Sequence, residues 1–228
     1  MYRKWDYADF RNNIAEGMNA TTAQVIKLLL CPSDALPEPV LHFNSAYAPQ
    51  YAWAYGYYGM SSYGGNAGRR SLGSSDNRAP THDGIFYADS QIRLVDVTDG
   101  ASNTFLFGER SHRDPEYDRL THDSQPAYYP LADFGAWAVV FGTGGPGGVN
   151  NSCNLLSPPV PINYQVPPNS VVGDGSIENR LCAYGSGHPG GANFALADGS
   201  VRFVSEQTSV EILQALSTRA SGEVVNLP

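Results

Sequence analysis

The chain has 228 residues, a formal net charge of −8 and only 16% charged residues. Its only lysines are Lys4 and Lys27, so it lacks the clustered basic residues by which proteins bind nucleic acid or anionic membranes. No run approaches the ~18 to 20 consecutive apolar residues of a membrane-spanning helix, so we expect no membrane span. The 24 glycines, 16 prolines and 14 tyrosines favour a loop-rich, β-containing protein rather than a helical one, with residues 1–228 in one domain.

The first thirty residues predict two short helices. Residues 8–18 and 21–30 each have short helical periodicity, and apolar residues such as Val25 and Leu29 gather on one side of the second. Pro32 follows immediately and ends this run, because proline cannot continue a helix.

Residues 31–206 predict a β-rich core of mainly antiparallel strands joined by long loops. Strand-like patterns cover residues 62–66, 84–87, 92–97, 103–109 and 136–141, and a glycine-rich loop follows at 142–148. Turns are predicted at four Asp-Gly pairs, because both residues tolerate the left-handed region; these begin at Asp83, Asp99, Asp174 and Asp198.

The strongest local pattern is a β-hairpin near the end of the chain. Phe194 and Leu196 alternate with smaller residues, Asp198-Gly199 forms a two-residue turn, and Val201 resumes the alternation. A final helix is predicted at residues 207–221. Thr208 and Glu211 form its capping box, and an apolar stripe follows at Val210, Leu213 and Leu216.

Residues 110–130 are highly charged and lack periodicity, which predicts an exposed loop. Carboxylate and imidazole side chains suit a divalent metal, and candidate ligands here are Glu109, His112, Asp114, Glu116, Asp118 and His122. A solvated charged loop is the alternative. Asp99 and Asn103 could offer oxygens to calcium, although a turn alone explains them.

The three cysteines are Cys31, Cys153 and Cys182, and no two of them form a Cys-x-x-Cys pair. Cys153 and Cys182 bracket a proline-rich segment that has little capacity to form a β-ladder or a helix of its own. A disulfide between them would contribute roughly 3 to 4 kcal/mol in an oxidising compartment. Two unpaired buried thiols are the alternative.

A stretch between residues 41 and 68 is rich in aromatic residues. Such side chains stack on sugars and are also enriched at subunit interfaces, so the stretch predicts either a glycan site or a protein contact. The residues concerned are Tyr51, Trp53, Tyr55, Tyr57 and Tyr58.

Several motifs of this chain occur in a characteristic order. They are Cys31-Pro-Ser-Asp34, Ser62-Tyr63-Gly-Gly-Asn66, Gly84-Ile-Phe86, Val97-Thr-Asp99-Gly-Ala-Ser-Asn103, Gly108-Glu109-Arg110 and His188-Pro-Gly-Gly-Ala-Asn193 leading to Asp198-Gly-Ser-Val-Arg202. Together they closely resemble, from about residue 25 to 224, the bacterial domain of unknown function named for its His-x9-Asp-Gly motif.

The resemblance implies a relative of type IV pilins and type II secretion pseudopilins, with an α+β domain behind a prepilin helix. That N-terminal spine helix is absent from this sequence. Pseudopilins place calcium in a C-terminal loop, so calcium is possible, although no cofactor is required. The family motif residues are expected to be structural; they are Cys31, Pro32, Asp34, Asp99, Asn103, Glu109, His188, Gly190, Gly191, Asn193, Asp198 and Gly199.

His188 has no catalytic nucleophile motif beside it, so we expect it to fix the entry to the hairpin. Its imidazole would bond a backbone carbonyl or a carboxylate such as Asp198. Gly190 and Gly191 would allow close approach of the backbone.

The sequence therefore predicts a non-catalytic structural or accessory subunit of a pilin-like assembly. It would lie at the cell surface, in the periplasm or outside the cell, and associate with itself or with other pilin-like subunits. The alternative is a surface-displayed module that binds a glycan, such as a polysaccharide, or a divalent metal.

Overall fold

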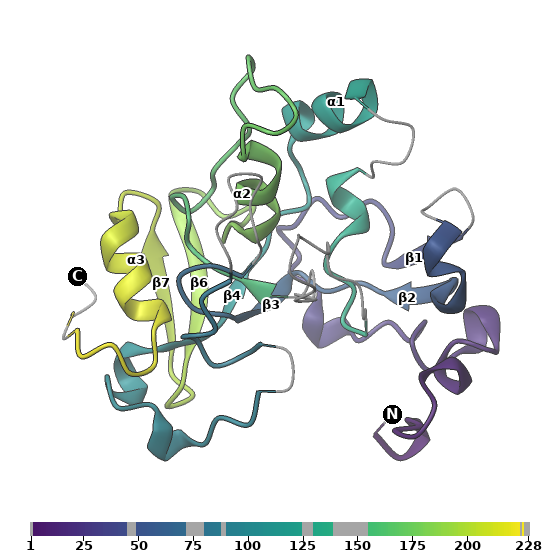
Figure 1. Ribbon diagram of the computed structural model, residues 1–228, viewed down its shortest axis with the longest axis horizontal. Helices are drawn as coiled ribbons and strands as arrows, with labels where there is room; N and C mark the ends of the chain where they lie inside the picture. Colours follow the sequence, from purple (N-terminus) through teal and green to yellow (C-terminus); the bar gives the residue numbers. More distant parts are fainter. Residues whose placement is uncertain are drawn as a thin grey trace.

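The computed structural model describes residues 2–44, 49–71, 80–87, 90–124, 130–138, 155–223 and 225. Within these ranges the chain has an α+β fold with two sheets and three short α-helices, as the sequence predicts. Figure 1 shows the N-terminal segments and the smaller sheet at one end of the molecule and the last helix at the other. The predicted loop at 142–148 lies outside the described residues.

The larger sheet has five strands in the order β5-β3-β4-β6-β7. Adjacent strands of this sheet run antiparallel, except that β3 and β5 run parallel to each other. In chain order the strands are β3 (Tyr63–Asn66), β4 (Phe105–Glu109), β5 (Leu155–Leu156), β6 (Gly191–Leu196) and β7 (Val201–Ser205).

Strands β6 and β7 form the predicted hairpin, with Ala195 opposite Val201 and Gly191 opposite Ser205. The Asp-Gly pair is at the turn, and Gly199 has a φ of +85°, which favours glycine. The Leu196 amide donates to the Ser200 carbonyl, so the loop holds three residues where two were predicted. Three-residue hairpin loops with glycine in the left-handed position are common.

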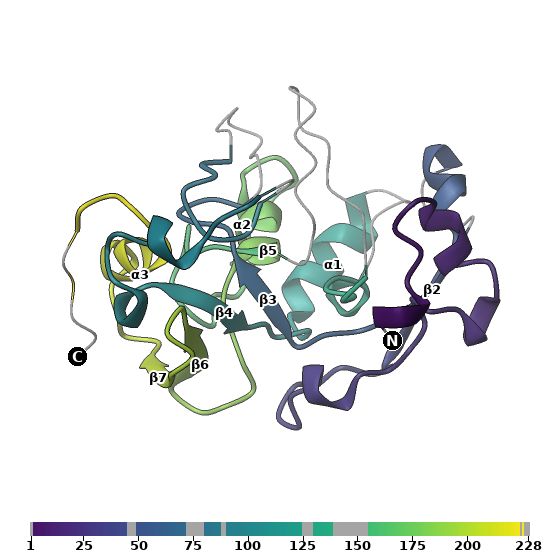
Figure 2. The ribbon, with the colours of Figure 1, turned by 90° about the horizontal axis from the view of Figure 1, so that it is seen from below.

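Helix α3 (Val210–Ser217) packs on one face of this sheet. Its Leu213 and Leu216 meet Phe105 and Phe194 in the core, and Figure 2 shows the helix beside β6 and β7. The predicted cap is wrong by one residue: the Ser209 side chain, not Thr208, accepts from the amide three residues later. Thr208 is buried instead.

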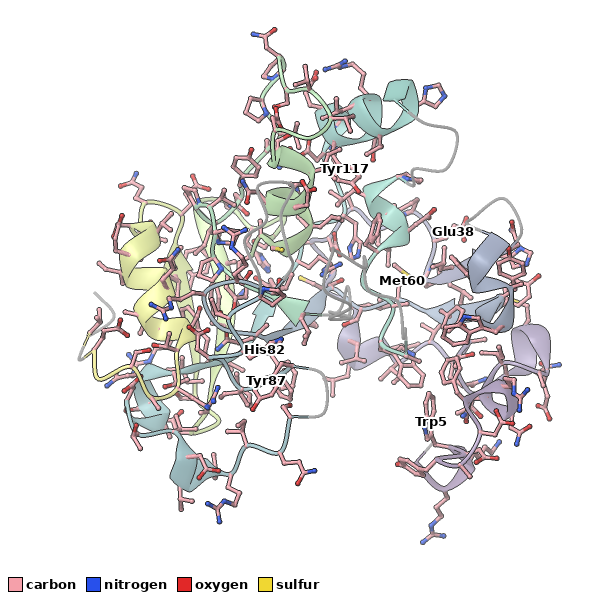
Figure 3. All side chains as sticks on the ribbon, in the orientation of Figure 1. Trp5, Glu38, Met60, His82, Tyr87 and Tyr117 are labelled. Carbon is pink, nitrogen blue, oxygen red and sulfur yellow. The ribbon has the colours of Figure 1, made fainter. Side chains whose placement is uncertain are left out.

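The smaller sheet pairs β1 (Val40–Phe43) with β2 (Gly56–Gly59) in antiparallel fashion. Phe43, Tyr58 and Met60 form its buried core. Trp5 packs on Trp137 with ring centroids 5.8 Å apart, and Figure 3 shows Trp5 and Met60 in this half of the molecule.

The two predicted N-terminal α-helices are wrong. The chain instead forms short 3-10 turns at Phe10–Asn13, Gly17–Asn19 and Lys27–Leu29. Val25 is exposed, and although Leu30 packs against the core of the smaller sheet, the predicted apolar stripe lacks full packing. Short helices are marginal in water without such packing.

The prediction of an exposed loop at 110–130 is also wrong. Pro115–Ser124 is helix α1, and it packs against helix α2 (Ser176–Cys182). Tyr117 and Leu120 of α1 are buried against Ile177 of α2, and Figure 3 labels Tyr117 on α1. Only two large apolar residues in this ten-residue segment give too little periodicity for a helix to be predicted.

Three predicted strands are not strands in the described structure. Residues 84–87 run as a loop whose Ile85 and Phe86 amides donate to the Asn66 carbonyl. Residues 92–97 contain a 3-10 turn at Leu94–Asp96, and Ala136 makes only an isolated bridge.

Arg219, which follows α3, holds the loop at 80–87 in place. Its amide donates to the Asp83 carbonyl, and its guanidinium donates to the carbonyls of His82 and Gly84. The same guanidinium lies over the ring of Tyr87, which stacks on His82 (Figure 3). The loop is therefore tied to the C-terminal segment.

Among the described residues, no helix has the length and apolar character needed to cross a membrane.

Candidate functional site

Three motif residues far apart in the sequence meet where β4 ends and β6 begins. Glu109 is the last residue of β4, and His188 precedes β6 by three positions. Cys31 follows the Lys27–Leu29 turn, which is held beside the sheet because the Ser62 amide donates to the Leu29 carbonyl. The polar tips of these three side chains lie within 4.8 Å of one another.

The three tips form a tight triangle. The distance from Cys31 Sγ is 3.5 Å to both Glu109 Oε1 and His188 Nε2. The remaining side, from His188 Nε2 to Glu109 Oε1, is 3.3 Å. Glu109 and Cys31 are buried, whereas the His188 side chain is 36% exposed, so one side of the triangle faces solvent.

Asn193 fixes the orientation of Glu109. Its backbone amide donates to Glu109 Oε2 at 2.6 Å, and its side-chain amide donates to the same oxygen at 3.2 Å. Both donors occupy one carboxylate oxygen, so Oε1 is directed to the cysteine and histidine.

Ser33 lies against the same triangle. Its Oγ is 3.0 Å from Cys31 Sγ and 3.2 Å from His188 Nε2. Gly187 packs directly on the Ser33 carbonyl, and any Cβ at position 187 would clash with it. Glycine is therefore required where the His188 loop touches the cysteine segment.

Tyr63, opposite Glu109 in the β3–β4 pair, borders the cluster. Burial raises the pKa of Tyr63 to about 12, and the nearby Cys31 and Glu109 side chains add to the rise. The phenol remains a neutral donor beside the thiol at physiological pH.

The prediction that His188 bonds Asp198 is wrong; its carboxylate neighbour is Glu109. Asp198 accepts from the amide and hydroxyl of Ser200 in its own turn. A Cβ on Gly191 would clash with the Val204 carbonyl, so the predicted close approach of the backbone is found there. Gly190 is in open space and is favoured by its φ of +83° instead.

Asp34 and His112 form a second buried pair next to the cluster. His112 Nδ1 lies 2.6 Å from Asp34 Oδ2, and the His112 amide donates to the other oxygen. Burial acts to raise the pKa of Asp34, but the hydrogen bond and charge of His112 outweigh it and the pKa is lowered. Pro32 starts the turn in which the Asp34 amide donates to the Cys31 carbonyl.

The structure does not bring the six charged metal candidates together. His112 is paired with Asp34, and Asp114 bonds Arg180. Glu116 pairs with Arg119 on the surface, Asp118 accepts from the Leu131 amide, and His122 is exposed on α1. Of the six, only Glu109 belongs to a cluster of three potential ligands in the described part of the chain.

Asp99 is engaged by the C-terminal segment. Its carboxylate accepts from the amides of Ser221 and Gly222 at 2.7 and 2.8 Å. Asn103 ends a 3-10 turn and its amide donates to the Gly100 carbonyl. The Asp99 carboxylate thus holds the C-terminal segment, and Asn103 belongs to the turn.

The aromatic stretch does not form one surface. Tyr58 is fully buried and donates to the Ala54 carbonyl, so it cannot contact a glycan or a partner. Tyr57 stacks on His42 and Tyr55 packs on Phe43, while Trp53 is half exposed. The side chain of Tyr51 is outside the described residues.

Cys182 is buried at the end of α2, and Cys153 is outside the described residues. The disulfide between them stays a prediction.

Sequence reasoning missed that Cys31, Glu109 and His188 form one cluster, and it missed Ser33 and Tyr63. Each of the five lies in or next to one of the motifs, and the co-occurrence of Cys, Glu and His in separate motifs is the signal that could have found them.

Comparison with known proteins identifies one family. The family model described as "Protein of unknown function (DUF1559)" matches residues 3–211. No curated protein and no solved structure matches the chain.

Proposed function

The chain belongs to the family of proteins of unknown function DUF1559, and from that premise we propose that it is a non-catalytic structural or accessory subunit of a pilin-like or pseudopilin-like assembly. The assembly would lie at the cell surface, in the periplasm or outside the cell. The order of motifs between Cys31 and Asp198 supports the pilin-like assignment by resemblance.

The observation that carries the proposal is the exposed apolar side of strand β7. Val201 and Phe203 are 66% and 54% exposed, on the opposite side of the strand from the buried Val204. Phe107 of β4 is partly exposed as well. Large apolar side chains on a sheet surface are typical of protein contacts.

The position of β7 strengthens this argument. Among the strands that the structure describes, it is the last in the sheet order and pairs with β6 alone. An edge strand presents backbone donors and acceptors to a second chain, and its side chains add affinity. The partner we propose first is a second copy of this chain, joined through β7.

Sedimentation velocity over a range of protein concentrations tests the proposal. We expect the chain to self-associate, and the double variant Val201→Thr/Phe203→Thr to weaken association roughly tenfold or more, because two apolar side chains lose their burial. Threonine preserves strand propensity.

The matched control is Leu94→Thr/Val95→Thr, which removes an equally exposed apolar pair from the turn at Leu94–Asp96. It should associate as the unaltered chain does. A chain that stays monomeric at all concentrations, or equal effects of the two double variants, would contradict the proposal.

A second candidate function, a module that binds a divalent metal, is favoured by one observation, the cluster of Cys31, Glu109 and His188.

A further inference from the structure

We propose that Cys31, Glu109 and His188 bind one divalent transition-metal ion of the zinc class, with a fourth coordination position open to solvent. The inference goes beyond a role in assembly and does not depend on it.

The spacing of the three ligand atoms is that of a tetrahedral zinc site. Zinc binds sulfur at about 2.3 Å and nitrogen or oxygen at about 2.0 to 2.2 Å, so tetrahedral angles put sulfur ~3.6 Å from either lighter atom and nitrogen ~3.4 Å from oxygen. The corresponding distances in the cluster are 3.5, 3.5 and 3.3 Å. One ion could therefore bind all three atoms with little movement.

The chemistry of the donors selects the kind of metal. A thiolate and an imidazole favour zinc and similar ions, whereas calcium and magnesium prefer an all-oxygen shell. The calcium that the sequence allowed is therefore not the ion for this cluster.

Charge gives a separate reason for a cation. The Glu109 side chain is 3% exposed and lies 3.5 Å from the Cys31 sulfur. Buried charges in proteins are paired or bind metals. A divalent ion would replace the thiol proton that Cys31 shares with Glu109 and would neutralise the carboxylate and the resulting thiolate together.

The surrounding residues form the outer shell that metal sites require. Asn193 donates twice to Glu109 Oε2 and leaves Oε1 directed to the ion position. Tyr63, opposite Glu109 in the neighbouring strand β3, borders the cluster. Such partners orient ligands and tune affinity.

The same atoms argue against a catalytic relay. In a Cys-His-carboxylate relay the carboxylate bonds one ring nitrogen and the nucleophile the other. Here Cys31 Sγ and Glu109 Oε1 both approach the same atom, His188 Nε2. Three atoms that converge on one point match coordination instead.

The open fourth coordination position of the ion would lie on the solvent-exposed side of the cluster. Three protein ligands with one open position characterise zinc sites that exchange water or a further ligand. The partial exposure of His188 gives solvent this access, and the Ser33 hydroxyl stands beside it.

Cobalt(II) titration of the chelator-treated full chain tests the proposal. We expect one ion per chain, with a sulfur-to-cobalt charge-transfer band and the intense visible bands of tetrahedral cobalt, all removed by added zinc. Cys31→Ser and His188→Gln should each abolish the charge-transfer or tetrahedral spectrum. Asn193→Ala, which retains the backbone donor, should weaken zinc binding by about tenfold.

Two variants serve as matched controls. Cys182→Ser replaces another buried cysteine, and His122→Gln removes an exposed imidazole in the charged segment. Both should keep the spectrum, with folding of every variant checked by circular dichroism. If Cys31→Ser fails to fold, His188→Gln tests the proposal, because His188 is the most exposed ligand and its replacement disturbs the fold least.

An unaltered, folded chain without the cobalt spectrum would overturn the proposal, as would a Cys31→Ser or His188→Gln variant that keeps it. Because the readout is the spectrum of a single chain, failure of self-association leaves this result unaffected.

Discussion

Arg180 and Asp114 form a buried ion pair, with Arg180 Nε 3.0 Å from Asp114 Oδ2. Desolvation lowers the pKa of Arg180, and the charge of Asp114 acts in the opposite direction. The carboxylate also accepts from the amide of Tyr117 at the start of α1 and from the amide of Val166. One carboxylate thus joins α1, α2 and the loop between them.

Replacing Arg180 should be among the most destabilising single changes. In Arg180→Met the buried Asp114 loses its cation, and we expect the free energy of unfolding to fall by about 3 to 5 kcal/mol in urea titrations. Arg93→Met is the control, because the Arg93–Asp96 pair is exposed and should change stability by about 1 kcal/mol or less. Similar losses in the two variants would refute a special role of the buried pair.

The buried Asn66 should be equally sensitive. Its side-chain amide donates to the carbonyls of Phe105 and Ser217, and its oxygen accepts from the Tyr184 hydroxyl. Asn66→Ala leaves these groups unsatisfied, and we expect a loss of at least ~2 kcal/mol, measured by urea unfolding. Asn12→Ala, whose amide bonds Asp6 on the surface, should change stability little. A loss no larger than that of the control would show that the network relaxes.

The lowered pKa of Asp34 predicts part of the loss of folding stability at acid pH. Its pKa is lower in the folded chain than the ordinary value for an aspartate, because His112 outweighs the effect of burial. The stabilisation that the ionised Asp34 provides is complete at pH values above its pKa in the unfolded chain. It is lost as the pH falls through its pKa in the folded chain. Urea midpoints measured from about pH 5 downward should therefore fall less steeply in Asp34→Asn than in the unaltered chain. Parallel pH curves would disprove the assignment.

Gly187 should control access to Cys31. In Gly187→Ala the new Cβ meets the Ser33 carbonyl and pushes the His188 loop away from the cysteine segment. We expect faster alkylation of Cys31 under native conditions, followed by mass spectrometry of the labelled peptide. Gly173→Ala adds backbone strain at a φ of +93° in open space and is the control for general loosening. An unchanged alkylation rate in Gly187→Ala would mean that the two segments are not held together as described.

Local patterns were reliable wherever a segment makes its structure from its own residues. The β6–β7 hairpin and α3 follow from alternation, an Asp-Gly turn and an apolar stripe, because turn geometry and side-chain period are properties of neighbouring residues. The α1 helix was missed because Tyr117 and Leu120 are buried by α2, which comes some sixty residues later. The N-terminal stripe failed for the opposite reason, since Val25 at its start stays exposed.

The cluster of Cys31, Glu109 and His188 likewise depends partly on local sequence and partly on tertiary structure. The sequence by itself determined which residues stand in motifs: Cys31 before a proline, Glu109 at the end of an apolar strand and His188 before a hairpin. Only the tertiary structure decided that these three meet, because the antiparallel register of β4 with β6 and the contact of Gly187 with Ser33 bring them together. Distances between side chains of remote segments depend on strand pairing and packing, which no local pattern encodes.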